Sequence, residues 1–201
     1  AESTAVLRSP ATQPAGPDMK RRANIRGFTL IELMVTVSLA AVLMVLAVPS
    51  MQEMLATQRV RGAASELLIT AQETRSAALK FNRRAVARPV DASAGWKGGW
   101  NIYIDNNANA TFETGTDTLV ISHDALTGDA VVAKLSGGNS NDFFAYQGTG
   151  FLDPSISGSA NATWEISSPG TSRRRCLVIE RSGRARIHEP PSGSTCSGVS
   201  S

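Results

Sequence analysis

The sequence contains few of the residues from which metal centres and nucleotide sites are built. Its 201 residues include two cysteines and two histidines, at spacings that fit no zinc finger, so a closed zinc site would need all four to converge. The motifs G-x-x-x-x-G-K-S/T and G-x-G-x-x-G are missing, which disfavours the common nucleotide-binding enzymes. Aromatic residues make up only 5%, yet 42% of the residues are hydrophobic. This excludes a disordered chain and favours one globular domain with an appendage.

Apolar residues concentrate in one run near the N-terminus, residues 28–48. The run contains a single charge, Glu32, and as a helix it would span about 31 Å, the thickness of a bilayer core. Four basic residues in 19–27 precede it, and positive charge keeps that end cytoplasmic. We therefore expect one membrane span with the C-terminal part outside the cytoplasm. A secretory signal is disfavoured because no small-x-small cleavage site follows the run.

The start of this run carries a family resemblance. The stretch Gly27-Phe28-Thr29-Leu30-Ile31-Glu32-Leu33, behind a short basic leader, resembles the class III signal of type IV pilins and type II secretion pseudopilins. The resemblance implies that a prepilin peptidase cuts after Gly27 and that Phe28 becomes the N-methylated first residue. It implies that Glu32 neutralises the amino terminus of a neighbouring subunit, which suits a carboxylate in hydrocarbon that needs a cationic partner. The rival reading is a plain single-span anchor with a chance glutamate.

The resemblance also implies a location and partners. The protein is expected in the bacterial inner membrane, single-pass with a periplasmic C-terminal domain, and then in a pilus or pseudopilus beside other pilins or pseudopilins. We expect Met19 to be the translation start and residues 1–18 to be disordered. The expected organisation is a disordered extension and leader (1–27), a transmembrane or filament-core helix (28–49), an amphipathic helix (50–84) and a β-rich periplasmic domain (85–201).

Helical periodicity continues beyond the apolar run and predicts one long helix from about 28 to 82. A kink is expected at Pro49 and a looser stretch at Gly62. An apolar stripe at helical spacing should pack on a sheet, with a coiled-coil dimer as the structural rival. The stripe comprises Met51, Leu55, Val60, Ala64, Leu67, Leu68, Ala71, Ala78 and Leu79.

From residue 85 onward, short β-branched runs alternate with turn residues and predict antiparallel sheet. The expected strands are 85–90, 100–104, 118–122, 131–135, 143–146, 163–166, 176–180 and 184–188, although matching is doubtful between 136 and 162. Ser182-Gly183 predicts a tight hairpin turn in which Gly183 has positive φ. The fold class is therefore α+β and pilin-like, with a long N-terminal helix packed on a C-terminal antiparallel β-sheet domain.

Two further stretches narrow the resemblance. Gly99-Trp100-Asn101-Ile102-Tyr103-Ile104-Asp105 and Gly183-Arg184-Ala185-Arg186-Ile187 resemble the FimT/GspH-type minor pilins. FimT-type proteins are implicated in DNA capture during natural transformation through a C-terminal G-R-x-R motif, which Gly183, Arg184 and Arg186 match. The resemblance therefore implies DNA as a partner.

The arginines themselves support that reading. Residues 99–170 hold one basic and eight acidic residues, whereas 171–201 hold six arginines and two glutamates. Arg184 and Arg186 are two apart on a predicted strand and should share a face, and paired guanidinium groups suit phosphate. Gly183 would allow close backbone approach. The proposed DNA-binding residues are Gly183, Arg184, Arg186, Arg181, Arg173, Arg174 and Arg175. The alternatives are a solvated basic edge, or a patch that docks on the acidic region of another subunit.

The cysteines and the oxygen-rich segment 105–113 have structural interpretations. Cys176 and Cys196 should form a periplasmic disulfide, with two free thiols as the alternative. The segment 105–113 places oxygen side chains at alternate positions as a calcium loop does, but Ala110 and Thr116 break that pattern, and an ordinary turn is the alternative. We assign no metal, cofactor or catalytic residue.

The remaining candidate functional residues are two histidines and three tryptophans. Isolated His123 and His188 suggest surface or strand-filling roles, and Trp96, Trp100 and Trp164 should pack the core, unless one is exposed and stacks on a base.

Three functions compete. The leading one is a FimT-like minor type IV pilin that contributes to pilus assembly and binds extracellular DNA through its arginine patch. The second is a GspH-like minor pseudopilin of a type II secretion system with a structural role and no DNA binding. An anchored periplasmic enzyme is disfavoured because no catalytic constellation is visible.

Overall fold

The structure is a computed structural model that describes residues 27–136, 143–157, 161–197 and 199. The chain divides into two compact units, Ala1–Val42 and Leu43–Ser201. The expected N-terminal extension and nearly all of the leader fall in residues 1–26, outside the described residues.

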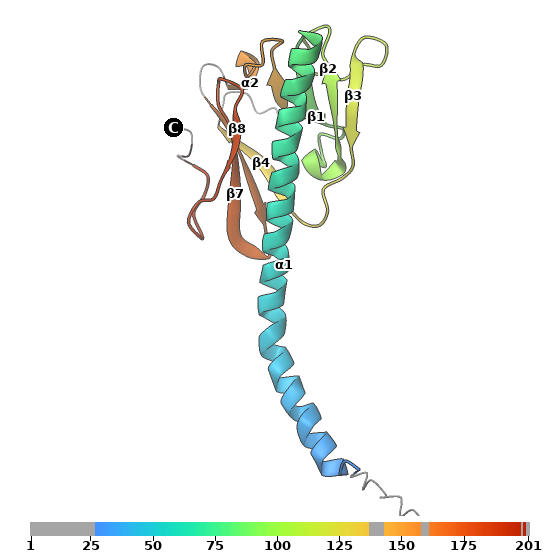
Figure 1. The fold of residues 1–201 in the computed structure, drawn as a ribbon, viewed down its shortest axis with the longest axis vertical. Coiled ribbons are helices and arrows are strands. Elements are labelled where there is room, and N and C mark those ends of the chain that lie inside the picture. The colour runs from blue at the N-terminus through green and yellow to red at the C-terminus, as the bar shows by residue number, and fades with distance from the viewer. Residues whose placement is uncertain (1–26, 137–142, 158–160, 198, 200–201) are drawn as a thin grey trace, which may run out of the picture. The chain divides into compact units, whose positions relative to one another are not determined.

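Helix α1 (Leu30–Phe81) has 52 residues and confirms the prediction of one long helix (Figure 1). It is unbroken at Pro49 and Gly62, where we expected a kink and a looser stretch. By length and composition, it is the one helix in the described part of the chain that could cross a membrane.

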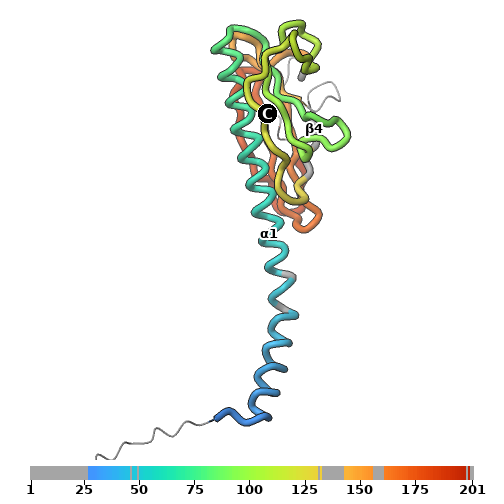
Figure 2. The backbone as a smooth tube through the Cα atoms, turned by 90° about the vertical axis from the view of Figure 1, so that its right-hand side faces the viewer, coloured from blue at the N-terminus to red at the C-terminus, as the bar shows by residue number. Residues whose placement is uncertain are grey.

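Within the Leu43–Ser201 unit, α1 lies along one side of the β-strands (Figure 2). The predicted apolar stripe is buried at five positions, which confirms helix–sheet packing: Val60, Ala64, Leu67, Ala71 and Ala78. The prediction is wrong for Met51, Leu55 and Leu79, which are exposed. Met51 and Leu55 precede Ala56, the first buried side chain among the described ones of α1, and Leu79 lies next to Gly150.

The strands form two antiparallel sheets of four. The first has the order β3-β2-β1-β5 and the second β4-β6-β7-β8. Their bounds are β1 (Ala85–Pro89), β2 (Trp100–Ile104), β3 (Thr118–His123), β4 (Val131–Ser136), β5 (Phe144–Tyr146), β6 (Ala162–Ser168), β7 (Thr171–Ile179) and β8 (Ala185–His188), with a 3-10 turn η1 (Gly95–Gly98) and a short helix α2 (Pro154–Ser157). The α+β prediction is confirmed.

Each expected strand has a counterpart, and the largest difference concerns the last hairpin. Strand β7 begins at Thr171, five residues before the expected start, so Arg173, Arg174 and Arg175 lie inside it. Strand β8 begins at Ala185, which leaves Arg184 in the turn.

The core lies between α1 and the sheets. Trp96, Trp100 and Trp164 are at most 1% exposed, as expected for core residues, so none of them is free to stack on a base. The Trp100 indole donates a hydrogen bond to Thr70 Oγ1 at 3.0 Å, which satisfies its polar atom against the helix.

Candidate functional site

The N-terminal motif leads directly into α1. Gly27, Phe28 and Thr29 precede the helix, so the bond between Gly27 and Phe28 lies in non-helical backbone. The N–H of Glu32 donates to Thr29 Oγ1 at 3.2 Å, an N-cap contact. Glu32 is exposed and forms no ion pair with any described residue. The motif therefore leaves an accessible bond and a carboxylate without a counter-charge.

The β7–β8 hairpin carries the predicted G-R-x-R stretch. Its turn is closed by hydrogen bonds from Glu180 N–H to Arg184 O (2.9 Å) and from Gly183 N–H to Glu180 O (2.8 Å). Gly183 has φ 82°, which confirms its predicted backbone role. Glu180 and Arg184 enclose the three residues 181–183, the same three that the expected strand bounds leave, and the loop has the form of a type I turn followed by a left-handed glycine.

Three arginines at this turn, Arg181, Arg184 and Arg186, are called the turn arginines below. Arg181 and Arg184 are exposed, and neither forms an ion pair with a described residue. Arg186 is 33% exposed at its side chain, and its Nε lies 3.3 Å from Glu180 Oε1. The turn therefore presents two uncompensated guanidinium groups and a third that shares its charge with a carboxylate.

Contacts with other segments fix the backbone of the turn. Gly183 is buried, and a Cβ there would lie 1.9 Å from Gly150 O. Arg75 of α1 donates from Nε to Gly150 O (3.0 Å) and from Nη2 to Ser182 O (3.1 Å). Burial raises the pKa of the neighbouring Tyr146 hydroxyl above its ordinary range, so no phenolate forms there at physiological pH. The glycine thus docks the turn on the protein, and its contact with DNA stays a prediction.

The other three arginines of the predicted patch, Arg173, Arg174 and Arg175, are called the strand arginines. Arg174 is ion-paired with Glu165, and Arg175 with Glu189. Arg173 Nη1 lies 3.6 Å from Glu189 Oε1. The six arginines therefore do not form one uncompensated patch, because two carboxylates balance much of the charge at the strand.

The C-terminal tail returns to β7 through a disulfide between Cys176 and Cys196, as predicted from sequence. The N–H of Cys196 donates to Glu165 Oε2 at 2.9 Å, on the same carboxylate that binds Arg174. Gly193 N–H donates to Ser172 O at 3.2 Å. The tail and Arg174 are therefore held by one buried carboxylate, that of Glu165.

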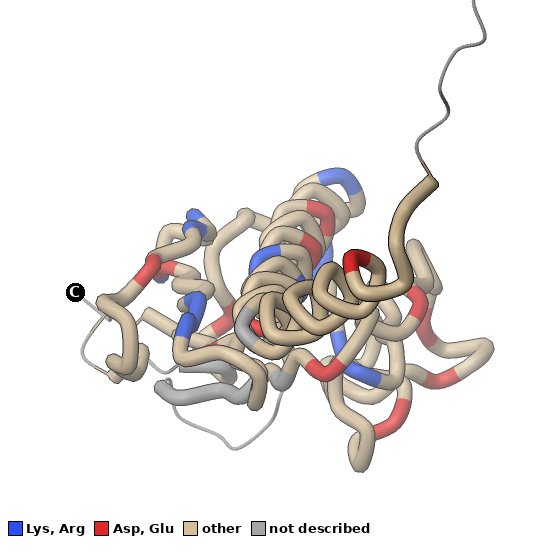
Figure 3. The backbone as a smooth tube through the Cα atoms, turned by 90° about the horizontal axis from the view of Figure 1, so that it is seen from below, with Lys and Arg blue, Asp and Glu red and all other residues tan. Residues whose placement is uncertain are grey.

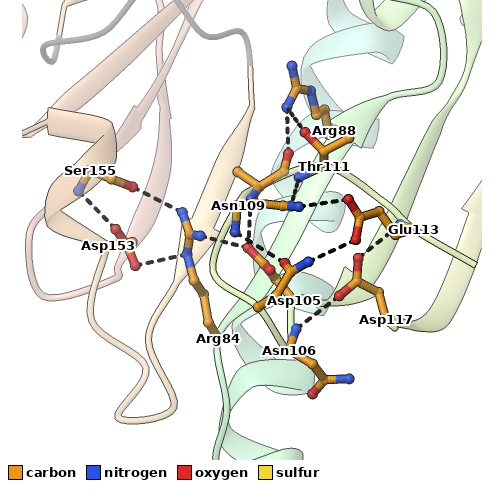
Figure 4. Close-up of polar contacts among 12 residues, drawn as sticks. Arg84, Arg88, Asp105, Asn106, Asn109, Thr111, Glu113, Asp117, Asp153 and Ser155 are labelled. Carbon is orange, nitrogen blue, oxygen red and sulfur yellow. Dashed lines mark hydrogen bonds and ion pairs between the residues drawn. The ribbon is translucent and has the colours of Figure 1, made fainter. Parts of the chain in front are cut away.

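Two acidic residues of the asparagine-rich loop after β2, Glu113 and Asp117, accept hydrogen bonds from within the loop (Figure 4). Asn107 and Asn109 donate their side-chain amides to the two oxygens of Glu113, at 2.8 and 3.0 Å. The two oxygens of Asp117 accept the N–H groups of Asn106 and Glu113, at 3.0 and 2.9 Å. These carboxylates are occupied by N–H donors, which is the pattern of a stabilised turn.

A third acidic residue of the loop, Asp105, joins a network with Arg84. Asp105 Oδ2 accepts Arg84 Nη1 at 2.6 Å and Ala110 N–H at 2.9 Å, and Arg84 Nε lies 3.1 Å from Asp153 Oδ2. Ala110 has φ 59°, so alanine takes the left-handed conformation where a calcium loop has glycine. Within the described ranges, no group of three His, Cys, Asp or Glu side chains could hold a metal. The geometry favours the turn reading over the calcium reading.

His123 acts as a packing residue. Its Nε2 lies 3.0 Å from Glu73 Oε2 of α1, and its ring stacks on Trp100 with centroids 5.0 Å apart. These contacts tie the edge strand β3 to the helix. His188 lies in β8 opposite Cys176, a strand-filling position.

Charge is distributed unevenly over the Leu43–Ser201 unit (Figure 3). On the side of β7, β8 and the C-terminus, Lys and Arg positions alternate with Asp and Glu, whereas the opposite side shows mainly Asp and Glu. The basic character of the C-terminal segment is thus local to its uncompensated arginines.

Sequence reasoning missed several residues of this site. Arg75 and Gly150 fix the turn from distant parts of the chain, and no local pattern identifies them. The pairing of Glu180 with Arg186 could have been predicted from the sequence, because the two residues flank one hairpin turn and lie diagonally opposite each other.

Two family models match the chain. The model described as type II transport protein GspH matches residues 63–183, and the prokaryotic N-terminal methylation motif matches residues 22–48. A search of curated protein sequences finds no match.

Solved structures share the fold at low identity. The type IV minor pilin FimU of Pseudomonas aeruginosa (strain PAO1) superposes with a TM-score of 0.53 and 20% identity, covering 68% of this chain and 96% of FimU. The minor pseudopilin EpsH of the type 2 secretion system of Vibrio cholerae gives a TM-score of 0.46 and 10% identity, covering 66% and 98%. The likeness to FimU supports the pilin-like fold.

Proposed function

This chain belongs to the GspH family of type II transport proteins, and from that premise we propose that it is a minor pilus subunit that also binds DNA. The methylation motif and the pilin-like fold place it among minor pilins and pseudopilins. The proposal adds a binding function, located at the turn arginines, and a role in the uptake of extracellular DNA during natural transformation.

The observation that carries the proposal is the state of Arg181 and Arg184. Both are exposed and form no ion pair with a carboxylate of the described residues, and they lie on a turn whose backbone is fixed by Arg75 and Gly150. Fixed backbone lowers the ordering cost of a contact, and a free guanidinium can bind a phosphate bidentately. These arginines offer phosphate contacts and no arrangement that reads base edges, so little sequence preference is expected.

The N-terminal motif supports incorporation into a filament. A prepilin peptidase would cleave the accessible bond between Gly27 and Phe28. Glu32 would then pair with the new amino terminus of a neighbouring subunit, since it has no counter-charge among the described residues. Replacing Glu32 by alanine should permit insertion into the inner membrane but impair assembly.

A second function, that of a type II secretion pseudopilin without DNA binding, is favoured by a different observation. The family description names type II transport, and four of the six arginines are paired with carboxylates. In that case the turn arginines would contact another pseudopilin.

Salt-dependent DNA binding by the full chain in lipid nanodiscs separates the two functions. Two or three phosphate contacts predict a slope of log affinity against log salt of about −2 to −3 on duplex DNA. The double variant Arg181→Gln/Arg184→Gln should reduce the slope towards zero and abolish transformation, with filament assembly intact. Lys97→Gln removes an exposed charge elsewhere and should have no effect. Unchanged affinity and slope in the double variant would refute DNA binding at this turn.

A further inference from the structure

An exposed aromatic residue, Phe151, lies on the segment that packs against the β7–β8 turn. Phe151 is 51% exposed, and in the described part of the chain it has no aromatic or cation–π partner. The three tryptophans are buried in the core.

Backbone contacts place Phe151 against the turn. The N–H of Leu152 donates to Arg181 O at 3.1 Å, and Gly150 lies directly against Gly183. These two contacts bracket Phe151 opposite Ser182, the residue between them. The backbone of Phe151 therefore lies opposite the middle of the turn.

The segment that carries the ring is itself fixed. Gln147 N–H donates to Phe151 O at 2.9 Å, Gly150 N–H donates to Gln147 O at 2.8 Å, and Asp153 N–H donates to Ala145 O at 2.9 Å. Both the ring and the guanidinium groups are thus presented by ordered backbone. An ordered aromatic side chain loses little conformational freedom when a planar group stacks on it.

We infer that this site takes single-stranded DNA, with an unpaired base stacked on Phe151 and the adjacent phosphates held by Arg181 and Arg184. The inference rests on the proposed DNA-binding function and specifies its substrate class. Arginines beside an aromatic stacking surface are the combination used by proteins that bind single strands without sequence preference. Bases within a duplex are already stacked on one another, so a duplex offers the ring no free base face. Glu180 faces the same turn but is engaged by Arg186.

Three fluorescent probes test the substrate class by anisotropy, with the full chain in nanodiscs. They are a short oligothymidylate, an abasic oligonucleotide of the same length, and a blunt duplex. Phe151→Ala should weaken binding of the oligothymidylate by about fivefold or more, because fivefold is the lower end of the effect expected when one stacked base is lost. Affinity for the abasic strand and the duplex should not change, because their contacts are to phosphates. Phe151→Trp should restore the oligothymidylate affinity.

Phe81→Ala is the matched control, because Phe81 is also an exposed phenylalanine (43%) and lines a groove with β3. It should leave all three affinities unchanged. If Phe151→Ala leaves oligothymidylate binding unchanged while Arg181→Gln/Arg184→Gln still abolishes it, stacking is refuted and phosphate binding stands. If the wild-type chain binds none of the probes, the proposed function itself fails. Loss of filament incorporation by Phe151→Ala with unchanged DNA affinity would instead identify Phe151 as a contact between subunits.

Discussion

The turn arginines and the strand arginines are equal in number and lie on the same hairpin, yet their electrostatic surroundings differ. The strand arginines share two carboxylates, Glu165 and Glu189, whereas at the turn Glu180 pairs with Arg186, and Arg181 and Arg184 form no ion pair with a described residue. A count of basic residues in the sequence does not reveal this difference. Strand register and the returning tail determine which guanidinium groups stay free for a ligand.

The strand arginines and the turn arginines have different structural roles. At the strand, ion pairs and the disulfide hold the C-terminal tail on β7. At the turn, hydrogen bonds from Arg75 and the close approach of Gly183 to Gly150 hold the backbone, and so the charges need no partner for the turn to be ordered. We attribute stability mainly to the first group and ligand binding to the second.

The largest expected effect comes from breaking the docking of the turn. Gly183→Ala should lower the free energy of unfolding by about 4 kcal/mol, because the residue has φ 82° and a Cβ would lie 1.9 Å from Gly150 O. Fluorescence of the three buried tryptophans during urea unfolding measures this. Gly193→Ala is the control: Gly193 has a similar φ of 81° with open space around it, and about 1 kcal/mol is expected. Equal losses in the two variants would contradict the docking role.

Removing the disulfide should affect the strand side alone. A Cys176→Ala/Cys196→Ala variant should lose roughly 3 kcal/mol of unfolding free energy, as expected for a bridge that closes a loop with a sequence separation of 20. Its DNA affinity should match the wild type, since the turn is held by other contacts. Thiol quantification on denatured, unreduced wild-type protein should find no free thiol. A large loss of DNA binding in the variant would show that the two groups are not independent.

A smaller effect should follow from removing the carboxylate that lies beside one turn arginine. Glu180→Gln removes the carboxylate that lies 3.3 Å from Arg186, and duplex affinity should rise about threefold because an exposed pair of this kind is worth up to about 1 kcal/mol. Weaker binding in this variant would show that Glu180 orders the turn rather than compensating its charge.

Much of the fold could be predicted from the sequence, because its determinants are local. The helix follows from periodicity, the strands from β-branched runs, and the hairpin turn from Gly183. The disulfide was predictable because the chain has two cysteines and an expected periplasmic location. These features depend on residues close in sequence or on simple counts.

The site was only partly predictable, because its decisive contacts join distant segments. Arg75 and Gly150 are far from Gly183 in sequence, and Phe151 is placed beside the turn only by backbone contacts with Arg181 and Gly183. The pairing of Glu189 with two strand arginines depends on the register of β8. Such three-dimensional neighbours leave no spacing signal in one sequence.

The central claim is that only the turn arginines bind DNA, and a comparison of salt slopes tests it most directly. Two double variants, Arg173→Gln/Arg175→Gln and Arg181→Gln/Arg184→Gln, should be titrated with the same duplex over a range of salt, with tryptophan fluorescence as the check of folding. We predict that the strand variant keeps the wild-type slope of log affinity against log salt, whereas in the turn variant this slope becomes less steep by about 2. A loss of slope in the strand variant together with an unchanged turn variant would contradict the account.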